Sequence, residues 1–252
     1  MPTVSRFLAG PRPRVIAHRG FSPPGSGIVE NTLPAFEAAL AAGAQIIETD
    51  VRASRDGVAV IGHDPDLSRL GGDARRLADL DHAELAGAGI VSLSEALEAL
   101  PEARFNIDIK SADAAVPAAR AIRAAGAVDR VLVASFSDAR RRAALALLPG
   151  ALTSASAVSF ATAFVAGRLG LAGLLGRALR GCAAVQVPER ALGANVPTPR
   201  LVRRLHEHGV EVHVWTIDDA AAMHRLLDAG VDGIVTNRTD VAIEVLQSRR
   251  AL

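Results

Sequence analysis

The sequence predicts an α/β protein built as a closed (β/α)8 TIM barrel, with a small β-hairpin inserted after the second strand. Short runs rich in Val and Ile alternate with longer Ala- and Leu-rich segments of helical periodicity, and the strand-like runs number eight. The chain has 252 residues, about the length that eight such units require. We therefore expect a single domain over residues 1–252. A doubly wound open sheet is the alternative, disfavoured because no Gly-rich dinucleotide motif follows the first strand.

The predicted strands and helices alternate along the whole chain. Strands are expected at 14–18, 45–50, 104–110, 130–136, 151–155, 183–187, 210–216 and 232–237. Helices are expected at 32–42, 94–100, 113–125, 138–148, 160–180, 198–208, 219–229 and 239–249. Four of these helices are followed by glycine, the residue that most often ends a helix: Gly43, Gly126, Gly209 and Gly230.

Residues 51–64 depart from this alternation. Arg55-Asp56-Gly57 is a tight-turn signal between two β-prone runs, so the segment predicts a hairpin that continues the second strand. A hairpin returns the chain to where it left. His63 is therefore expected close to Glu48 and Asp50.

Charge and cysteine content exclude several classes of protein. Lys and Arg number 28 and Asp and Glu 27, so there is no overall field for nucleic acid or an anionic membrane, and local charges must bind any anionic ligand. We expect a small-molecule ligand and no nucleic-acid partner. Cys182 is the single cysteine, which excludes an internal disulfide. The first 14 residues lack the apolar core of a secretory signal, which predicts a cytoplasmic protein.

The most hydrophobic segment, residues 155–181, predicts a packed helix with an apolar exposed flank near the site. Arg168 falls near its middle, and glycines recur through it. A spanning helix needs roughly 20 apolar residues, and a central arginine costs about 2.5–3.5 kcal/mol on insertion. We therefore expect no stable membrane insertion.

Carboxylates gather at the predicted carboxyl ends of the strands, where such barrels carry their chemistry. Glu48 and Asp50 are two residues apart and so point to the same face of their strand, and Asp108 on a neighbouring strand adds a third carboxylate. Three oxygen ligands suit a hard divalent cation, Mg2+ or Ca2+, better than zinc. The alternative, which spacing alone leaves open, is that Glu48 and Asp50 pair with Arg52 or Arg55 on the surface.

Cations and imidazoles at the same strand ends point to a phosphate ligand. Lys110 lies two residues after Asp108, and the planar fork of Arg19 suits phosphate oxygens. His18 and His63 then flank this anion site, and imidazoles titrate near neutrality, so the pair can serve as general base and general acid. Gln186 and Trp215 end the sixth and seventh strands.

Several short motifs, in order along almost the whole chain, resemble the glycerophosphodiester phosphodiesterase family. They are "HRG" at 18–20, "ENT" at 30–32, "ETD" at 48–50, "RDG" at 55–57, "HD" at 63–64, "DIK" at 108–110, "VHVWTID" at 212–218 and "VDGIVTNRTD" at 231–240. The resemblance implies a TIM barrel that hydrolyses glycerophosphodiesters to an alcohol and sn-glycerol 3-phosphate with a divalent cation.

The resemblance also implies roles for matching positions. It assigns acid–base catalysis to His18 and His63, the metal to Glu48, Asp50 and Asp108, the phosphate to Arg19 and Lys110, and the substrate pocket to Gln186 and Trp215. Asp64 is expected to orient the hairpin or His63. Glu30 and Asn31 are expected to be structural, with Asn31 or Thr32 capping the following helix.

Three departures from the family pattern bear on function. The family usually has Glu where this chain has Asp108, whose carboxylate reaches about 1–1.5 Å less far, enough to change the metal site. Arg69 is followed by Leu70 where the family often has Arg-Thr, a peripheral change. The segment 65–103, a region that in the family helps to form the substrate mouth, is short. Two other functions stay open: lysophospholipase D hydrolysis of lysophospholipids, which the apolar segment 155–181 favours, and a non-catalytic phosphate-binding protein, which the Asp108 change favours.

Overall fold

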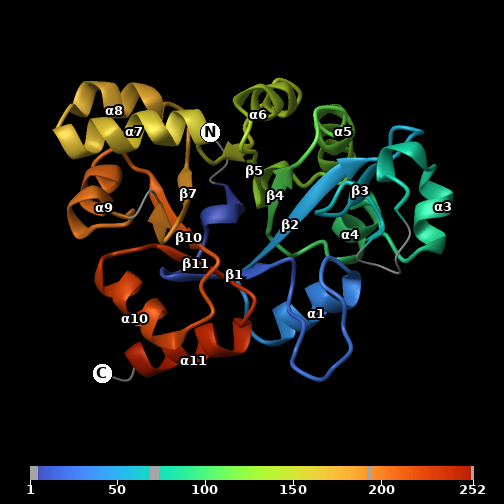
Figure 1. Cartoon of the computed structure of the whole chain (residues 1–252), viewed down its shortest axis with the longest axis horizontal. Helices are drawn as coiled ribbons and strands as arrows, with labels where there is room; N and C mark the ends of the chain where they lie inside the picture. Colours follow the sequence, from blue (N-terminus) through green and yellow to red (C-terminus); the bar gives the residue numbers. More distant parts are fainter. Residues whose placement is uncertain (1–4, 69–73, 192–193, 251–252) are drawn as a thin grey trace.

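The computed structural model describes residues 5–68, 74–191 and 194–250, so Arg69 and Leu70 lie outside the described residues. Parallel strands of the described chain surround a central axis (Figure 1), in the order β6-β5-β4-β2-β1-β11-β10-β7. They are β1 (Arg14–His18), β2 (Ile46–Ala53), β4 (Phe105–Ile109), β5 (Val131–Ala134), β6 (Leu152–Thr153), β7 (Ala184–Pro188), β10 (Glu211–Trp215) and β11 (Gly233–Thr236).

The two ends of this sheet, β6 and β7, come together and nearly close the barrel. Ser154 forms a parallel bridge with Ala184, and the Ala155 amide donates to the Ala184 carbonyl oxygen at 2.9 Å. On the other side, the Ala183 amide donates to the Thr153 carbonyl oxygen at 2.8 Å. The predicted TIM barrel is confirmed, and the open doubly wound sheet is wrong.

A short antiparallel strand, β3 (Ala59–Ile61), pairs with the end of β2 through Val51–Ile61 and Ala53–Ala59. Gly57 makes the turn with a φ of +78°, a conformation that L side chains rarely adopt. The Gly62 amide then donates to the Asp50 carbonyl oxygen at 3.0 Å, which places His63 beside the strand end.

Helices cover the outside of the barrel in the described residues. Side chains cap several of them; Thr32, for instance, accepts the Ala35 amide at 3.4 Å and so is the cap of the first helix. The predicted helices outside residues 155–181 are present as α1 (Leu33–Ala41), α4 (Leu93–Ala99), α5 (Ala115–Ala124), α6 (Asp138–Leu145), α9 (Pro199–His206), α10 (Ala220–Asp228) and α11 (Thr239–Arg250). Elements that the sequence did not predict are all short: η1 (Arg6–Leu8), η2 (Leu77–Asp79), α3 (His82–Gly87), η3 (Val128–Arg130), β8 (Arg190–Ala191) and β9 (Ala194–Asn195).

The predicted single helix over 160–180 is wrong. The segment forms two helices, α7 (Ala157–Leu169) and α8 (Ala172–Ala178), because Gly170 ends α7 with a φ of +77°. Gly167 lets α7 approach α9 closely, since a β-carbon there would lie 2.6 Å from Leu201 Cδ1. Among the described residues, no helix is both long and apolar enough to cross a membrane.

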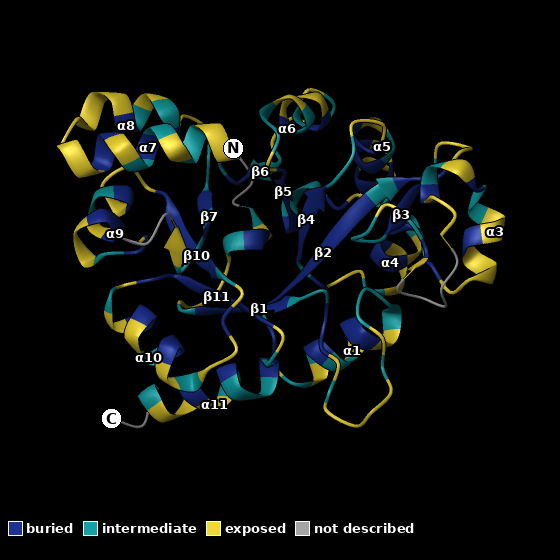
Figure 2. Cartoon of the chain, in the orientation of Figure 1, coloured by how far each residue is buried: buried dark blue, intermediate teal, exposed yellow. Residues whose placement is uncertain are grey.

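Apolar packing between strands and helices forms the core. The strands of the barrel are almost entirely buried, while the helices show one buried and one exposed side (Figure 2). On one side of the barrel, Phe36 of α1 meets Phe105 of β4 edge to face at 5.7 Å between ring centres. The strands are thereby fixed, and so are the side chains at their ends.

A buried ion pair lies at the amino ends of the strands, opposite the predicted site. Arg14 begins β1 and Glu211 begins β10, and two nitrogens of Arg14 bond the two carboxylate oxygens at 2.9 Å each. Arg14 is 2% exposed and also donates to the Leu8 and Ala9 carbonyl oxygens at 2.7 and 3.1 Å. His213 Nε2 lies 3.2 Å from Glu211. This network joins the N-terminal segment to the barrel.

Acid is expected to weaken the fold through Glu211. Burial alone raises its pKa, but the bonds from His213 and Arg14 outweigh burial and lower the pKa from 4.5 to about 2. A carboxylate whose pKa is lowered on folding contributes stability above its unfolded pKa, and loses it as the pH falls through the folded pKa. The free energy of unfolding of the wild type, measured in urea, should therefore fall as the pH is lowered from about 4.5 to 2. The Glu211→Gln variant should show a flatter profile; parallel profiles would contradict this assignment.

Candidate active site

All nine predicted site residues line one cavity at the carboxyl ends of the strands. The cavity has a volume of about 490 Å³. Side chains from β1, β2, β4, β7 and β10 and from the segment after β3 reach into it. The predicted residues in its wall are His18, Arg19, Glu48, Asp50, His63, Asp108, Lys110, Gln186 and Trp215.

Strand register explains why these residues converge. His18 of β1 lies opposite Glu48 of β2, and Asp50 of β2 lies opposite Asp108 of β4. Glu48 in turn faces Asn106, a buried pocket residue that we did not predict. Asn106 is two residues before Asp108, so strand alternation alone could have identified it.

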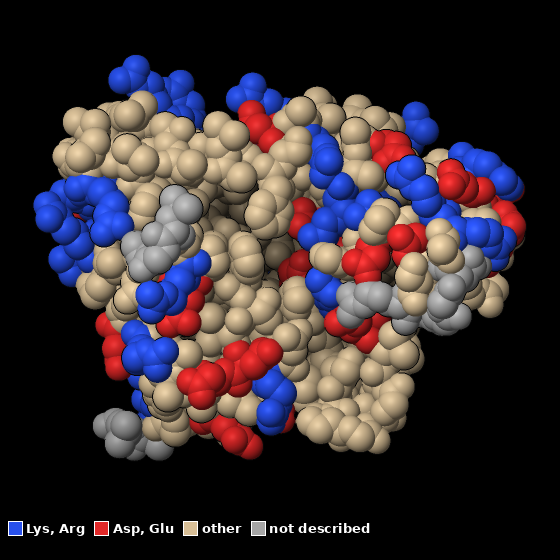
Figure 3. Space-filling view, viewed as in Figure 1, with Lys and Arg blue, Asp and Glu red and all other residues tan. Residues whose placement is uncertain are grey.

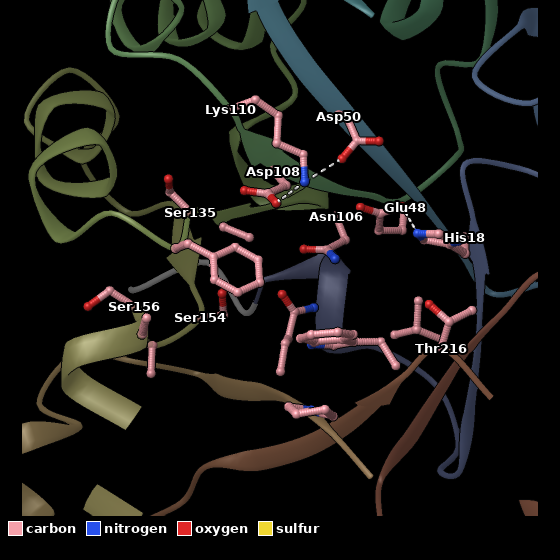
Figure 4. A pocket seen from close by; sticks show the side chains of 18 of the residues that line it. His18, Glu48, Asp50, Asn106, Asp108, Lys110, Ser135, Ser154, Ser156 and Thr216 are labelled. Carbon is pink, nitrogen blue, oxygen red and sulfur yellow. Dashed lines mark hydrogen bonds and ion pairs between the residues drawn. The ribbon is translucent and has the colours of Figure 1, made fainter. Parts of the chain in front are cut away.

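Lys110 lies between two carboxylates (Figure 4). Its ammonium nitrogen is 2.8 Å from Asp50 Oδ1 and 2.6 Å from Asp108 Oδ2. Arg19 approaches Asp50 from the other side, with Nε 3.1 Å from Oδ2. Burial alone would raise the pKa of Asp50, but Lys110 and Arg19 together lower it. Asp50 is thus held as a charged carboxylate with two cations.

The alternative pairing of the carboxylates with surface arginines is wrong. Arg52 donates from Nε to the His63 carbonyl oxygen at 2.8 Å, and Arg55 pairs with Asp81 at 2.6 Å. Neither arginine is the partner of Glu48 or Asp50, because those two side chains point into the pocket.

Glu48 differs from Asp50 in that it forms no ion pair with a Lys or Arg side chain within the described residues. Its carboxylate accepts the Arg19 backbone amide at 3.1 Å, and His18 Nε2 lies 4.0 Å away. Burial, with repulsion from Asp50 and Asp108, raises the pKa of Glu48 well above its ordinary value. The site therefore has more carboxylate than cation at this point.

The oxygen donors fit a hard divalent cation. Asp108 Oδ1 and Asn106 Oδ1 are buried and have no hydrogen-bond partner in the described structure, and both belong to a pocket with an unneutralised carboxylate, Glu48. A cation bound there would satisfy these atoms. In the arrangement that the structure describes, however, no three His, Cys, Asp or Glu side chains converge closely enough to hold a metal ion.

His18 is held by an asparagine at the end of β11. Asn237 Oδ1 lies 2.7 Å from His18 Nδ1, while Asn237 Nδ2 donates to Asp218 at 2.9 Å. Because the asparagine nitrogen is engaged, its oxygen accepts, and His18 Nδ1 must carry the proton. Burial lowers the pKa of His18 despite this bond. Asn237 was in a recognised motif but was not predicted as a site residue.

His63 is held by its neighbour along the chain. His63 Nδ1 lies 2.7 Å from Asp64 Oδ1, which is one of the two roles expected of Asp64 from the sequence. The Arg52 bond to the His63 carbonyl fixes the backbone of the same segment. Nε2 of each histidine is left without a hydrogen bond in the described structure, and both rings line the pocket.

The turn after β1 has an unusual backbone. Arg19 and Asn31 both have φ of +58°, and the Asn31 amide donates to the Arg19 carbonyl oxygen at 2.8 Å. Non-glycine residues in this region are strained and concentrate at functional sites. Gly20 follows with φ of +83°, and a β-carbon there would lie 2.7 Å from the Ala35 backbone. The turn thus needs glycine at residue 20 and aims Arg19 back into the site.

The pocket wall facing the carboxylates is apolar. Phe136 follows β5 and meets Trp215 edge to face at 6.0 Å between ring centres, and Phe160 of α7 continues this wall. We predicted Trp215 but neither phenylalanine, because no motif marks them. Gln186 lies on the same side, and its Nε2 is buried without a partner in the described structure.

Comparison with known proteins decides the family. The family model described as "Glycerophosphoryl diester phosphodiesterase family" matches residues 18–241. The chain belongs to the glycerophosphoryl diester phosphodiesterase family. A family member from Mycobacterium tuberculosis (strain ATCC 25618 / H37Rv), named "Probable glycerophosphodiester phosphodiesterase 2", is 43% identical over 98% of this chain and 96% of its own.

Solved structures of the family share the fold. The glycerophosphodiester phosphodiesterase from Agrobacterium tumefaciens str. C58 superposes with a TM-score of 0.72 at 24% identity, covering 93% of this chain and 99% of that one. A phosphodiesterase from Oleispira antarctica, solved in complex with the product sn-glycerol-3-phosphate, gives a TM-score of 0.73 at 23% identity, covering 94% and 97%.

Proposed function

We propose that this chain hydrolyses glycerophosphodiesters to an alcohol and sn-glycerol 3-phosphate, using a divalent cation and two histidines. Family membership and the similarity to the M. tuberculosis protein support the reaction class. The observation that carries the proposal for this chain is the cavity itself, where two imidazoles face one space together with Arg19 and Lys110. A phosphodiester there would meet cations for its charge and imidazoles for its proton transfers.

The charged groups divide between phosphate and metal. Arg19 and Lys110 are proposed to bind the phosphate oxygens, and Glu48, Asp50 and Asp108 to hold Mg2+ or Ca2+. When bound, such a cation neutralises phosphate charge and stabilises the charge that develops in the transition state. Lys110 forms ion pairs with both Asp50 and Asp108. The position of the Lys110 ammonium therefore also depends on the charges of these two carboxylates.

The two histidines are proposed to have different roles. With its Nδ1 proton held by Asn237 and its pKa lowered by burial, His18 is neutral and offers the Nε2 lone pair, which suits a general base. His63, whose Nδ1 lies 2.7 Å from the Asp64 carboxylate and whose ring lines the cavity, is proposed as the acid that protonates the leaving alkoxide. Gln186 and Trp215 are proposed to contact the substrate.

Metal removal tests the proposal. The purified chain should release glycerol 3-phosphate from glycerophosphocholine, and EDTA should abolish this release. Adding Mg2+ or Ca2+ in excess of the chelator should restore it. The metal that restores the higher rate is the one preferred by a site in which Asp108 stands where the family usually has Glu. No turnover with any divalent metal, while the chain still binds glycerol 3-phosphate, would favour the non-catalytic binding protein.

Asn237→Ala should lower kcat about tenfold or more and change KM little, because the base loses its fixed orientation while the phosphate contacts remain. Asn195→Ala is a matched control, since Asn195 is exposed and does not line the pocket. Equal kcat values for the two variants would show that the Asn237 bond has no part in positioning His18.

A second candidate, lysophospholipase D activity, is favoured by the apolar pocket wall. Phe136, Phe160 and Trp215 offer apolar contact to an acyl chain. Turnover of lysophosphatidylcholine measured beside glycerophosphocholine separates the two: a higher kcat/KM for the lysophospholipid would make it the substrate, whereas a higher value for glycerophosphocholine supports the main proposal.

A further inference from the structure

The outer face of α7 and the turn into α8 is apolar although it faces solvent. Val158 is 71% exposed, Val165 53% and Leu169 68%, and together with Ala161 they follow one another at helical spacing along a single face. Leu171 and Leu174 extend the patch over the turn. Of the eight exposed large apolar side chains in the described residues, five lie between 158 and 174. We call these five residues the α7–α8 patch.

The inner face of the same two helices is already packed. Ala163 and Ala166 of α7, Leu175 of α8 and Leu179, directly after α8, are buried in the core that includes α9. An ordinary surface helix pairs such a face with a polar outer face. The α7–α8 patch therefore has no role in holding this domain together, and an exposed apolar area of this kind marks a surface for a partner.

The charged side chains of α7, of α8 and of the residues directly after α8 are all basic. Residues 139–188 contain no Asp or Glu, and Arg168, Arg177 and Arg180 lie on or just after α7 and α8. All three arginines are exposed, and none pairs with a carboxylate in the described structure. In Figure 3 the surface over α7 and α8 is mainly uncharged, with basic side chains at its margin. The partner is thus apolar at its centre and acidic at its surface.

The patch is continuous with the pocket. Ala157 and Phe160, in the first turn of α7, line the cavity, and Val158 between them is the most exposed residue of the patch. Phe160 contacts Phe164 at 5.9 Å between ring centres, and the Arg168 guanidinium lies 5.2 Å from the Phe164 ring centre. A partner on the patch would therefore lie at the mouth of the pocket.

We propose that the α7–α8 patch docks the protein onto the surface of a lipid bilayer that carries anionic headgroups. The apolar residues enter the boundary between headgroups and acyl chains, and the three arginines meet lipid phosphates. The helices lie along the surface rather than across the bilayer. This surface binding goes beyond the proposed reaction and does not require catalysis.

A bilayer fits these observations better than a second copy of the chain. In a symmetric dimer the same patch meets itself, so the three arginines of each copy would face those of the other with no acidic residue between them. A protein covering the patch would also lie against the pocket mouth. A lipid surface supplies the missing negative charge and leaves a route from lipid to pocket.

Vesicle binding tests the proposal directly. We expect the full chain to co-sediment with phosphatidylcholine vesicles that contain 30% phosphatidylglycerol, about tenfold more than with pure phosphatidylcholine, and less as salt is raised. Val165→Asp/Leu169→Asp should lower binding roughly tenfold or more, because charge replaces buried apolar contact. Val116→Asp on α5, also an exposed valine, should bind as the wild type does.

Arginine variants test the electrostatic part. Arg177→Gln/Arg180→Gln should lower binding about fivefold or more per charge, whereas Arg120→Gln/Arg123→Gln, the same change of net charge on α5, should leave it unchanged. None of these residues lines the pocket, and urea unfolding that matches the wild type is the folding check, which does not depend on the proposed activity. Equal binding by the two arginine pairs would overturn the proposal.

Two other outcomes would overturn it as well. One is no binding of the wild-type chain to anionic vesicles. The other is a stable dimer, seen by sedimentation at micromolar concentration, that Val165→Asp/Leu169→Asp dissociates; the patch would then be an interface between copies. If vesicle binding holds while no glycerophosphodiester is hydrolysed, the proposed function fails and the docking surface stands.

Discussion

Replacing His18 or His63 with alanine is expected to lower kcat for glycerophosphocholine by roughly 10²–10⁴-fold. Each ring lines the pocket and is held by its own partner, Asn237 or Asp64, so neither can take over the position of the other. The measurement is the rate of glycerol 3-phosphate release at saturating substrate. His208→Ala, at an exposed histidine of the barrel surface, is the control and should keep the wild-type rate.

A second substrate separates the two histidines. A nitrophenyl ester of glycerol 3-phosphate has a leaving group that departs without a proton, so a variant lacking the general acid should lose much less activity on it. We expect His63→Ala to recover on this ester and His18→Ala to stay impaired. Recovery by His18→Ala alone would make His18 the general acid and His63 the general base. Near-normal glycerophosphocholine activity in either variant would show that the replaced histidine has no part in the mechanism.

Arg14→Met is expected to lower the free energy of unfolding by about 3–5 kcal/mol, the usual result of removing one partner of a buried ion pair. The Glu211 carboxylate would lose its bidentate partner, and the Leu8 and Ala9 carbonyl oxygens would lose a donor. Urea unfolding at pH 7 measures the change.

Arg12→Met is the matched control for this buried pair. Arg12 also bonds a carboxylate, Asp232 at 2.9 Å, but its side chain is 54% exposed, so about 1 kcal/mol or less should be lost. Arg14→Met/Glu211→Leu should be more stable than Arg14→Met, because the unpaired charge is gone. Equal losses for Arg14→Met and Arg12→Met would contradict the assigned importance of the buried pair.

Most of the barrel was predictable because its strands are short apolar runs and its helices are periodic. The helix over 160–180 was not, because α7 and α8 share one composition and no polar break separates them. Gly170 was the available signal, but glycine recurs through the segment at 167, 170, 173 and 176, which hid the one position with a left-handed backbone. The β8–β9 pair was missed because each strand has two residues.

The site was predictable where its residues belong to strands. Alternation on β2 and β4 places Glu48, Asp50, Asp108 and Lys110 at one pocket. Asn237 lies 219 residues from its partner His18, and only the meeting of β1 with β11 brings the two together. The left-handed backbone of Arg19 was also unpredictable, because arginine has no local preference for it.

The two sides of the barrel are not equally secured, and this bears on what the pocket can accept. Within the described residues, β2 and β4 are paired at five residue positions. β6 is paired with β5 at two positions, and one bridge, Ser154–Ala184, connects the end of β6 to β7. Segments with few ladder bonds open at the lowest free energy. The seam between β6 and β7 carries Ser154–Ala157 of the pocket wall. The charged side of the pocket therefore rests on a five-pair ladder, and the side beside α7 on a two-pair ladder.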